Sequence, residues 1–304
     1  MQPFADRLAD AVKGRRSPVV VGLDPRVKQL PDSLRPGDSA TPDEIAAAYE
    51  KFCIGVIDAV SGHVGVVKPQ LAFFEQIGPA GMVALANVIS YARNQGLIVI
   101  ADGKRNDIGS TATAYAGAYL AEADHGLASD SLTVSPYLGE DSITPFVDSA
   151  KQSGTGIFVL VKTSNPGGGM LQDLVADGKP IYQHVAEFVQ RLAESTTSDS
   201  GYGAVGAVVG ATYPDQLREL RSVMTNAWIL IPGFGAQGGT AADVVAGFDE
   251  NGLGAVINSS RGIIFAHARE EYASFGNADW QRAVEQAAID MNEQLRSETP
   301  AGRL

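Results

Sequence analysis

Short apolar runs alternate along this chain with longer stretches of helical periodicity. The runs are rich in β-branched residues and end in polar or charged positions, as buried parallel strands do. They span residues 18–24, 64–69, 97–102, 131–135, 156–161, 204–209, 228–232 and 254–258. The segments between and after them predict helices at 42–60, 81–94, 110–123, 142–151, 181–194, 214–224, 241–247 and 279–296. The pattern therefore predicts eight consecutive βα units.

Two helices carry clear local signals. Thr41-Pro42-Asp43-Glu44 supplies a cap residue, a proline at the first helical position and a glutamate at the capping-box position. Residues 3–14 predict a short amphipathic helix ahead of the first strand, with Phe4 and Leu8 on one side.

Eight βα units in a chain of 304 residues indicate an α/β fold, a (β/α)₈ TIM barrel, an architecture for which about 250 residues is typical. An open doubly wound sheet is the alternative, and the count of eight favours closure. Because no linker or change of composition interrupts the chain, residues 1–304 predict a single domain with a short N-terminal helix. Residues 298–304 predict a flexible tail.

Composition excludes several classes of protein. Hydrophobic residues make up 45% and charged residues 19%, which is enough for a sizeable core. The net charge of −12 argues against nucleic acid and anionic membranes as partners. Cys53 is the one cysteine, so an internal disulfide is excluded and a reducing compartment, the cytoplasm, is expected. No apolar run is long enough to span a bilayer, and four scattered histidines predict no metal site.

Charged residues gather where the predicted strands end. Asp24 ends the first strand, Lys68 the second, and the third leads into Asp102, Lys104 and the nearby Asp107. Asp102 and Lys104 are two apart, so on a strand they share a face. Buried charges are costly unless they pair with each other or with a ligand. An isolated Asp-x-Lys favours a salt-bridged strand terminus, whereas the whole set favours a catalytic lysine between carboxylates.

Glycine-rich sequence follows the seventh strand and an arginine follows the eighth. In (β/α)₈ barrels these two loops form the usual phosphate site. Glycines there let backbone N–H groups approach an anion, and a guanidinium can grip phosphate in a bidentate way. A glycine-rich loop alone indicates only a tight turn, but the arginine in the expected place favours the phosphate site. The candidate residues are Gly235, Gly238, Gly239 and Arg261.

The ordered set of motifs resembles one family, the orotidine 5′-phosphate decarboxylases. The resemblance lies in Asp102-x-Lys104-x-x-Asp107-Ile108, with Asp24 and Lys68 upstream and residues 235–239 and 260–261 downstream. The stretches 163–167 and 257–261 resemble the longer bacterial branch of that family. The similarity runs from the first strand to the eighth, and it implies conversion of orotidine 5′-phosphate to uridine 5′-phosphate and CO₂ without a cofactor.

The resemblance also implies roles for the charged residues. Lys104 is the proton donor, in an alternating network with Lys68, Asp102 and Asp107. Asp107 and Thr111 are expected to reach the neighbouring subunit's site in a homodimer. Loss of CO₂ leaves a carbanion at C6, which an ammonium group can stabilise and then protonate.

Substrate-binding residues follow from the same resemblance. Asp24 is expected to bind ribose hydroxyls and Ser164 to bind the amide edge of the pyrimidine. Gln237 and Arg261 are expected to hold the phosphate.

Two other functions fit part of the pattern. A metal-dependent sugar-phosphate decarboxylase or aldolase shares the barrel and the Asp-x-Lys-x-x-Asp triplet, but Lys68 and the loop at Ser164 argue against it. A non-catalytic barrel that senses a phosphate ligand would not require alternating lysines and aspartates, which are costly to keep buried.

Overall fold

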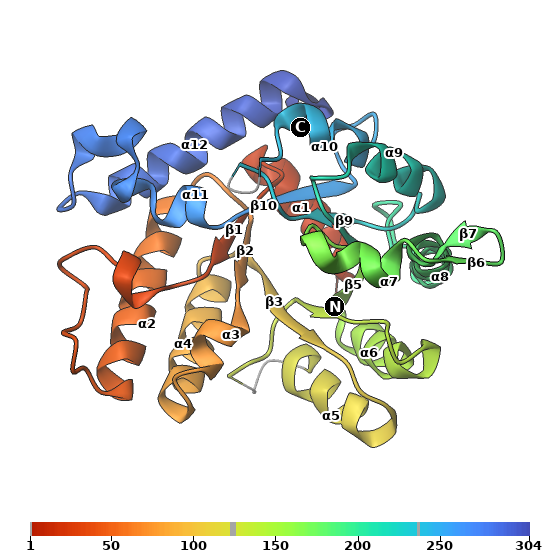
Figure 1. The fold of residues 1–304 in the computed structure, drawn as a ribbon, viewed down its shortest axis with the longest axis horizontal. Coiled ribbons are helices and arrows are strands. Elements are labelled where there is room, and N and C mark those ends of the chain that lie inside the picture. Colours follow the sequence, from red (N-terminus) through yellow and green to blue (C-terminus); the bar gives the residue numbers. More distant parts are fainter. Residues whose placement is uncertain (1, 122–125, 236–237) are drawn as a thin grey trace.

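A closed barrel of parallel strands forms the centre of the molecule. The computed structural model describes residues 2–121, 126–235 and 238–304. In these ranges eight strands pair in the order β1-β2-β3-β4-β5-β8-β9-β10, with β10 closing onto β1 (Figure 1). They are β1 (Val19–Leu23), β2 (Val66–Pro69), β3 (Ile98–Arg105), β4 (Ser131–Val134), β5 (Gly156–Lys162), β8 (Val205–Val209), β9 (Ile229–Ile231) and β10 (Ala255–Ser259). The TIM barrel is confirmed, and the open sheet is excluded.

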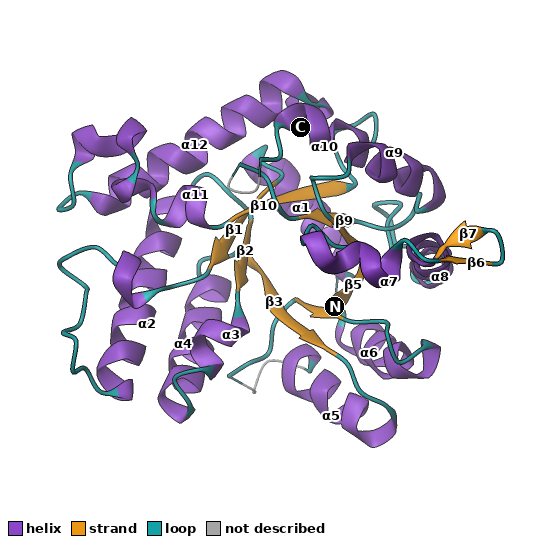
Figure 2. Ribbon diagram, in the orientation of Figure 1, coloured by secondary structure: helices purple, strands orange, loops and turns teal. Residues whose placement is uncertain are grey.

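Helices surround the strands (Figure 2). They are α1 (Phe4–Arg15), α2 (Pro42–Val60), α3 (Leu71–Glu75), α4 (Pro79–Asn94), α5 (Gly109–Leu120), α6 (Glu140–Ser153), α8 (Ile181–Glu194), α9 (Pro214–Val223), α10 (Ala241–Val244), α11 (Arg261–Ile264) and α12 (Trp280–Glu298). The long helices lie within a few residues of their predicted bounds. The short α3, directly after β2, was not predicted from the sequence.

Alternate strand residues face two different cores. Val19 and Val21 pack into the layer between strands and helices, whereas Val20 lies in the barrel interior with the strand residues Val66 and Val256. Helix α1 packs on that interior from behind the strands in Figure 1. Its Phe4 ring meets Phe158 edge to face, with 6.0 Å between the ring centroids. Helix α1 therefore plugs the end of the barrel where the strands begin.

The start of α2 shows how local sequence fixes a helix. The Glu44 N–H donates to Thr41 Oγ1 at 3.3 Å, and the Thr41 N–H donates to Glu44 Oε2 at 2.8 Å. This reciprocal pair is the predicted capping box, and Pro42 occupies the first turn.

The connection between β5 and α8 has structure that the sequence pattern did not predict. It contains a 3₁₀ turn (Pro166–Gly168), α7 (Gly169–Gln172) and an antiparallel hairpin of β6 (Val175–Ala176) and β7 (Lys179–Pro180). Figure 2 shows the hairpin outside the barrel, beside α8. We call residues 163–180 the β5–α8 insertion.

The last residues of the chain differ from the predicted flexible tail. Pro300–Arg303 form a 3₁₀ turn in which Ala301 is buried. The carbonyl of Leu304 accepts a hydrogen bond from Arg16 Nε at 2.7 Å. These contacts attach the segment to α12 and to the end of α1. Within the described ranges, no helix is long and apolar enough to cross a membrane.

Candidate active site

A bulge at the carboxyl end of β3 presents Lys104. Ala101 to Arg105 on β3 span the same length of sheet as Leu132 to Val134 on β4, so β3 carries extra residues there. Lys104 has a left-handed backbone with φ 45°, a conformation that costs about 1 kcal/mol or more outside glycine. Its N–H donates to Thr133 Oγ1 at 2.9 Å. The bulge lets the Lys104 side chain turn back toward Asp102.

Asp102 is the centre of the charged cluster. It is only 7% exposed and accepts four hydrogen bonds. Its Oδ2 accepts from Lys68 Nζ at 2.5 Å and Gln70 Nε2 at 3.1 Å, and its Oδ1 from Lys104 Nζ at 2.6 Å and Thr133 Oγ1 at 2.9 Å. Burial alone would raise the pKa of Asp102, but the two ammonium groups lower it, and the net shift is downward. Asp102 is therefore a carboxylate at neutral pH.

The two lysines differ in their access to solvent. Lys68 is 4% exposed, whereas the side chain of Lys104 is 48% exposed. Burial alone would lower the pKa of Lys68, yet the charges of Asp102 and Asp24 outweigh it and raise that pKa. Both Lys68 and Asp102 are thus enclosed ions, and Lys104 is the member of the trio that a ligand can reach.

Asp24 follows the carboxyl end of β1, the neighbour of β2. Its Oδ1 is buried and has no hydrogen-bond partner in the described part of the chain. The same holds for Oδ1 of Asn258 on β10, which pairs with β1 on the other side. Buried polar atoms without partners are rare and mark places where a ligand or water binds. The binding of ribose hydroxyls by Asp24 stays a prediction.

Asp107 and Thr111 do not join the cluster within one chain. Asp107 Oδ1 accepts from the N–H of Ile108 at 2.8 Å, and none of the ion pairs among the described residues includes Asp107. Thr111 is exposed on the first turn of α5. One chain therefore brings three of the four predicted network residues together.

Ser164 lies two residues beyond β5, close to the end of β8. A Cβ atom built on Gly210 would lie 2.7 Å from the Ser164 Cβ. Only glycine allows this approach, which places half-buried Ser164 against the backbone that follows β8.

Two of the predicted phosphate residues, Gly235 and Arg261, line one cavity of about 600 Å³. Gly235 and Gly238 have φ of 68° and 90°, values that favour glycine. The N–H groups of Gly235, Gly238 and Gly239 all donate to carbonyls inside the loop. In this conformation they hold the turn, and Arg261 is the group that offers charge to an anion. Gln237 lies outside the described residues.

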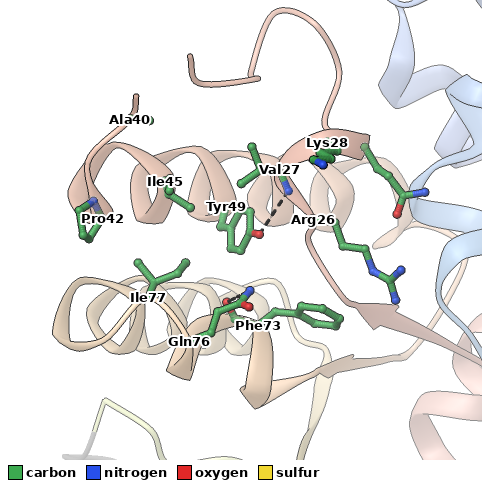
Figure 3. Close-up of a pocket in the computed structure, with 11 residues that line it drawn as sticks. Arg26, Val27, Lys28, Ala40, Pro42, Ile45, Tyr49, Phe73, Gln76 and Ile77 are labelled. Atoms are coloured by element: carbon green, nitrogen blue, oxygen red, sulfur yellow. Dashed lines mark hydrogen bonds between the residues drawn. The ribbon is translucent and has the colours of Figure 1, made fainter. Parts of the chain in front are cut away.

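A second cavity lies beside the segment that follows β1 (Figure 3). It has a volume of about 780 Å³ and lies between residues 26–29, α2 and α3. The Tyr49 hydroxyl accepts from the N–H of Val27 at 3.2 Å, and Arg26 stacks on Phe73 at the end away from Pro42. None of Asp24, Lys68, Asp102 and Lys104 lines it, so we place the chemistry at the barrel rim instead.

Sequence reasoning missed two neighbours of Asp102. Gln70 follows Lys68 by two residues, and Thr133 lies inside the apolar run of β4. The spacing of Gln70 from Lys68 was a usable signal because both lie at the end of β2. Thr133 gave no signal, because only the pairing of β3 with β4 brings it to Asp102. In the described ranges, no three His, Cys, Asp or Glu side chains could hold a metal ion together.

Comparison with known proteins points to one family. Residues 17–274 match the profile of the orotidine 5′-phosphate decarboxylase / HUMPS family. The orotidine 5′-phosphate decarboxylase of Rhodopirellula baltica is 60% identical over 301 residues, covering 97% of this chain and 100% of that protein. That of Caldicellulosiruptor bescii is 36% identical over 307 residues, covering 98% and 99%. The structure of Leishmania donovani OMP decarboxylase has a TM-score of 0.76 and 32% identity, covering 97% of this chain and 98% of that one.

Proposed function

This chain belongs to the orotidine 5′-phosphate decarboxylase family, and we propose that Lys104 is the acid that protonates C6 of the product. The protein is a carboxy-lyase of pyrimidine synthesis that converts orotidine 5′-phosphate to uridine 5′-phosphate and CO₂. The observation that carries the role of Lys104 is that its amine lies 2.6 Å from the buried Asp102 carboxylate while its side chain is 48% exposed at the rim.

The charges at the rim suit this reaction. Breaking the bond between C6 and the carboxylate releases CO₂ and leaves the electron pair on C6. The Lys104 ammonium stabilises that pair and transfers a proton to C6, and solvent then protonates the neutral amine again. The fixed carboxylate of Asp102, whose Oδ1 accepts from the Lys104 amine at 2.6 Å, holds that amine at the rim. Asp102 also crowds the carboxylate of the substrate, which destabilises the ground state.

The substrate would lie across the rim from β10 to β5. Asp24 binds the ribose hydroxyls with the carboxylate oxygen that lacks a partner among the described residues. Ser164 binds the amide edge of the pyrimidine, and Arg261 binds the phosphate together with Gln237. The N–H groups of Gly235, Gly238 and Gly239 join them only when the phosphate replaces the carbonyls to which they donate in this conformation. Phosphate binding far from C6 can contribute to catalysis by closing loops over the reacting centre.

We further propose that the enzyme is a homodimer in which Asp107 and Thr111 reach the partner's site. Asp107 has no ion pair among the described residues of its own chain. Beside it Ile108 is 53% exposed, and Tyr137 and Leu138 in the loop after β4 are 74% and 44% exposed. Since β3 and β4 pair, the loops that carry these apolar side chains leave the barrel at the same rim, where a second copy can cover them.

We also propose that the enzyme works in the cytoplasm. Cys53 is buried and is the chain's one cysteine, so the fold does not depend on an oxidising compartment.

Replacement of Lys104 tests the central proposal. Purified protein should decarboxylate orotidine 5′-phosphate in the presence of a chelator, measured by the change in ultraviolet absorbance. Lys104→Ala should lower turnover by about a thousandfold or more while uridine 5′-phosphate still binds. Lys51→Ala, at an exposed position of α2, is the matched control. Retained turnover in Lys104→Ala would refute the role, and loss of wild-type activity with chelator would favour the metal-dependent alternative.

A further inference from the structure

Lys162 is a buried lysine at the end of β5 that the chemistry above does not use. It is 1% exposed, and its amine donates to Asp173 Oδ1. The amine also lies 4.5 Å from the ring centroid of Tyr213 and 5.4 Å from that of Tyr182. Removing an ammonium group from water is costly unless a counter-ion and polarisable groups surround it. The position of Lys162 therefore depends on Asp173 staying in place.

Asp173 belongs to the β5–α8 insertion and directly follows α7. Its neighbour Gln172 makes a second connection to the end of β5. Gln172 Oε1 accepts from the N–H of Thr163 at 3.1 Å, and Gln172 Nε2 donates to Thr163 Oγ1 at 2.8 Å. Asp173 thus binds Lys162, the last residue of β5, and Gln172 binds Thr163, the residue after it. We call Lys162, Thr163, Gln172 and Asp173 the latch.

Ser164 directly follows Thr163 of the latch in the sequence. On its other side lies Gly210, where an added Cβ would be 2.9 Å from the Ser164 N atom. The backbone of Ser164 is therefore held between the end of β8 and the latch.

We propose that the latch positions Ser164 for recognition of the pyrimidine and couples this recognition to the order of the β5–α8 insertion. The proposal rests on the base-binding role of Ser164 given above. Lys162 is in this account a positioning residue, since its amine is enclosed by the insertion and by two tyrosine rings.

The unequal burial of Lys162 and Asp173 determines which arrangement of the insertion is favoured electrostatically. Asp173 has a side chain that is 52% exposed, whereas that of Lys162 is 1% exposed. If the insertion moved away, Asp173 would regain water, whereas the Lys162 amine would lose its counter-ion and keep only the rings of Tyr182 and Tyr213 beside it. The electrostatic cost therefore falls on the open arrangement, and the ion pair favours the arrangement that fixes Ser164.

Asp173→Asn tests the proposal, with Glu187→Gln as its matched control. Glu187 also pairs with a lysine of the insertion, Lys179, but at the surface of α8. Calorimetry should compare uridine 5′-phosphate, which carries the base, with ribose 5-phosphate, which does not. We expect Asp173→Asn to weaken binding of uridine 5′-phosphate by roughly tenfold and to leave ribose 5-phosphate unchanged. An equal loss for both ligands, or no loss, would overturn the proposal, as would the same selective loss in Glu187→Gln.

A double-mutant cycle with Ser164→Ala shows whether the latch acts through Ser164. If it does, the effects of Asp173→Asn and Ser164→Ala on the affinity for uridine 5′-phosphate are less than additive, because either change removes the same contact. Additive effects overturn the coupling.

Hydrogen exchange separates the latch from the base-binding role of Ser164. Asp173→Asn should speed amide exchange at 163–173 whether or not Ser164 binds the base. Unchanged amide exchange in Asp173→Asn would overturn the latch. An unchanged affinity of Ser164→Ala for uridine 5′-phosphate would overturn the base-binding role of Ser164 and the coupling that depends on it.

Discussion

Asp102 is the residue on which the charges of the site depend. Each of its two oxygens binds one lysine amine and one neutral donor. Its burial would favour the neutral acid, and only the two adjacent cations reverse that preference. The same arrangement explains how a buried Lys68 stays charged.

The lowered pKa of Asp102 predicts a pH dependence of stability. The ordinary value is 3.8 and the folded value is lower, so the ionised group stabilises the fold above about pH 4. This contribution is lost as the pH falls through the folded pKa. Asp102→Asn should therefore be less stable than wild type at neutral pH, and the difference in free energy of unfolding should shrink in acid. Urea denaturation between about pH 7 and pH 3 measures the free energy of unfolding of wild type and of Asp102→Asn. A difference between the two that stays constant with pH would contradict the prediction.

Arg105 holds the bulge that presents Lys104. Its Nη1 donates to the Gly103 carbonyl at 2.8 Å, and its guanidinium lies over the rings of Tyr115 and Tyr119. Arg105→Ala should lower kcat by about ten- to a hundredfold, because small displacements of a reacting group are costly. Arg105→Lys should restore part of the rate, since its amine can still donate to that carbonyl.

The matched control for Arg105 is Arg93→Ala, which also removes a guanidinium bonded to a backbone carbonyl, that of Ala128 at 3.2 Å. Steady-state kinetics should show no loss of kcat in this control. An equal loss in both variants would mean that stability, and not the bulge, explains the effect.

Among the elements, α1 has a purely structural task at the end of the barrel away from the site. Its apolar face packs on the barrel interior, where Phe4 meets Phe158. A Cβ on Gly206 would lie 2.6 Å from that Phe158 ring, so the interior is already full. The plug and the interior side chains form one core.

Truncation of the plug should weaken the whole fold. Phe4→Ala removes a side chain that is 1% exposed and should lower the free energy of unfolding by about 3–5 kcal/mol. Lys13→Ala, at an exposed position of the same helix, should change it little. Chemical denaturation compares the two. If both variants were as stable as wild type, α1 would not be part of the cooperative core.

At the scale of the whole molecule, the site is open on one side. Lys104 is half exposed, and Asp107 lies apart from the cluster. The exposed apolar residues beside Asp107 lie on the same rim. A second copy on this surface would both cover the apolar side chains and bring another carboxylate to each site.

Mixing two inactive variants tests that arrangement. Lys104→Ala and Asp107→Ala should each be nearly inactive alone. A hybrid dimer of the two contains one site with both residues intact, so subunits that are mixed and allowed to exchange should recover up to about a quarter of the wild-type activity per protein. Sedimentation checks the dimer. Recovery of no activity in a confirmed hybrid would show that Asp107 acts within its own chain, and full activity of Asp107→Ala alone would show that it has no role.

Much of this arrangement could be read from the chain itself. The alternation of apolar runs and helical periodicity gave the order and bounds of the barrel elements, because these patterns depend on neighbours in sequence. The capping box at Thr41 is local in the same sense. The acids and lysines at strand ends predicted the rim site, since parallel strands bring their carboxyl ends together.

Other features were decided only by tertiary structure. Thr133 reaches Asp102 through the pairing of β3 with β4, and the extra residues of the bulge appear only when the two strands are in register. Lys162 directly follows the predicted strand 156–161, and its buried ion pair exists only because the insertion folds back and supplies Asp173. Contacts between residues far apart in sequence depend on register and packing across the barrel, and the local pattern of polar and apolar positions does not encode them.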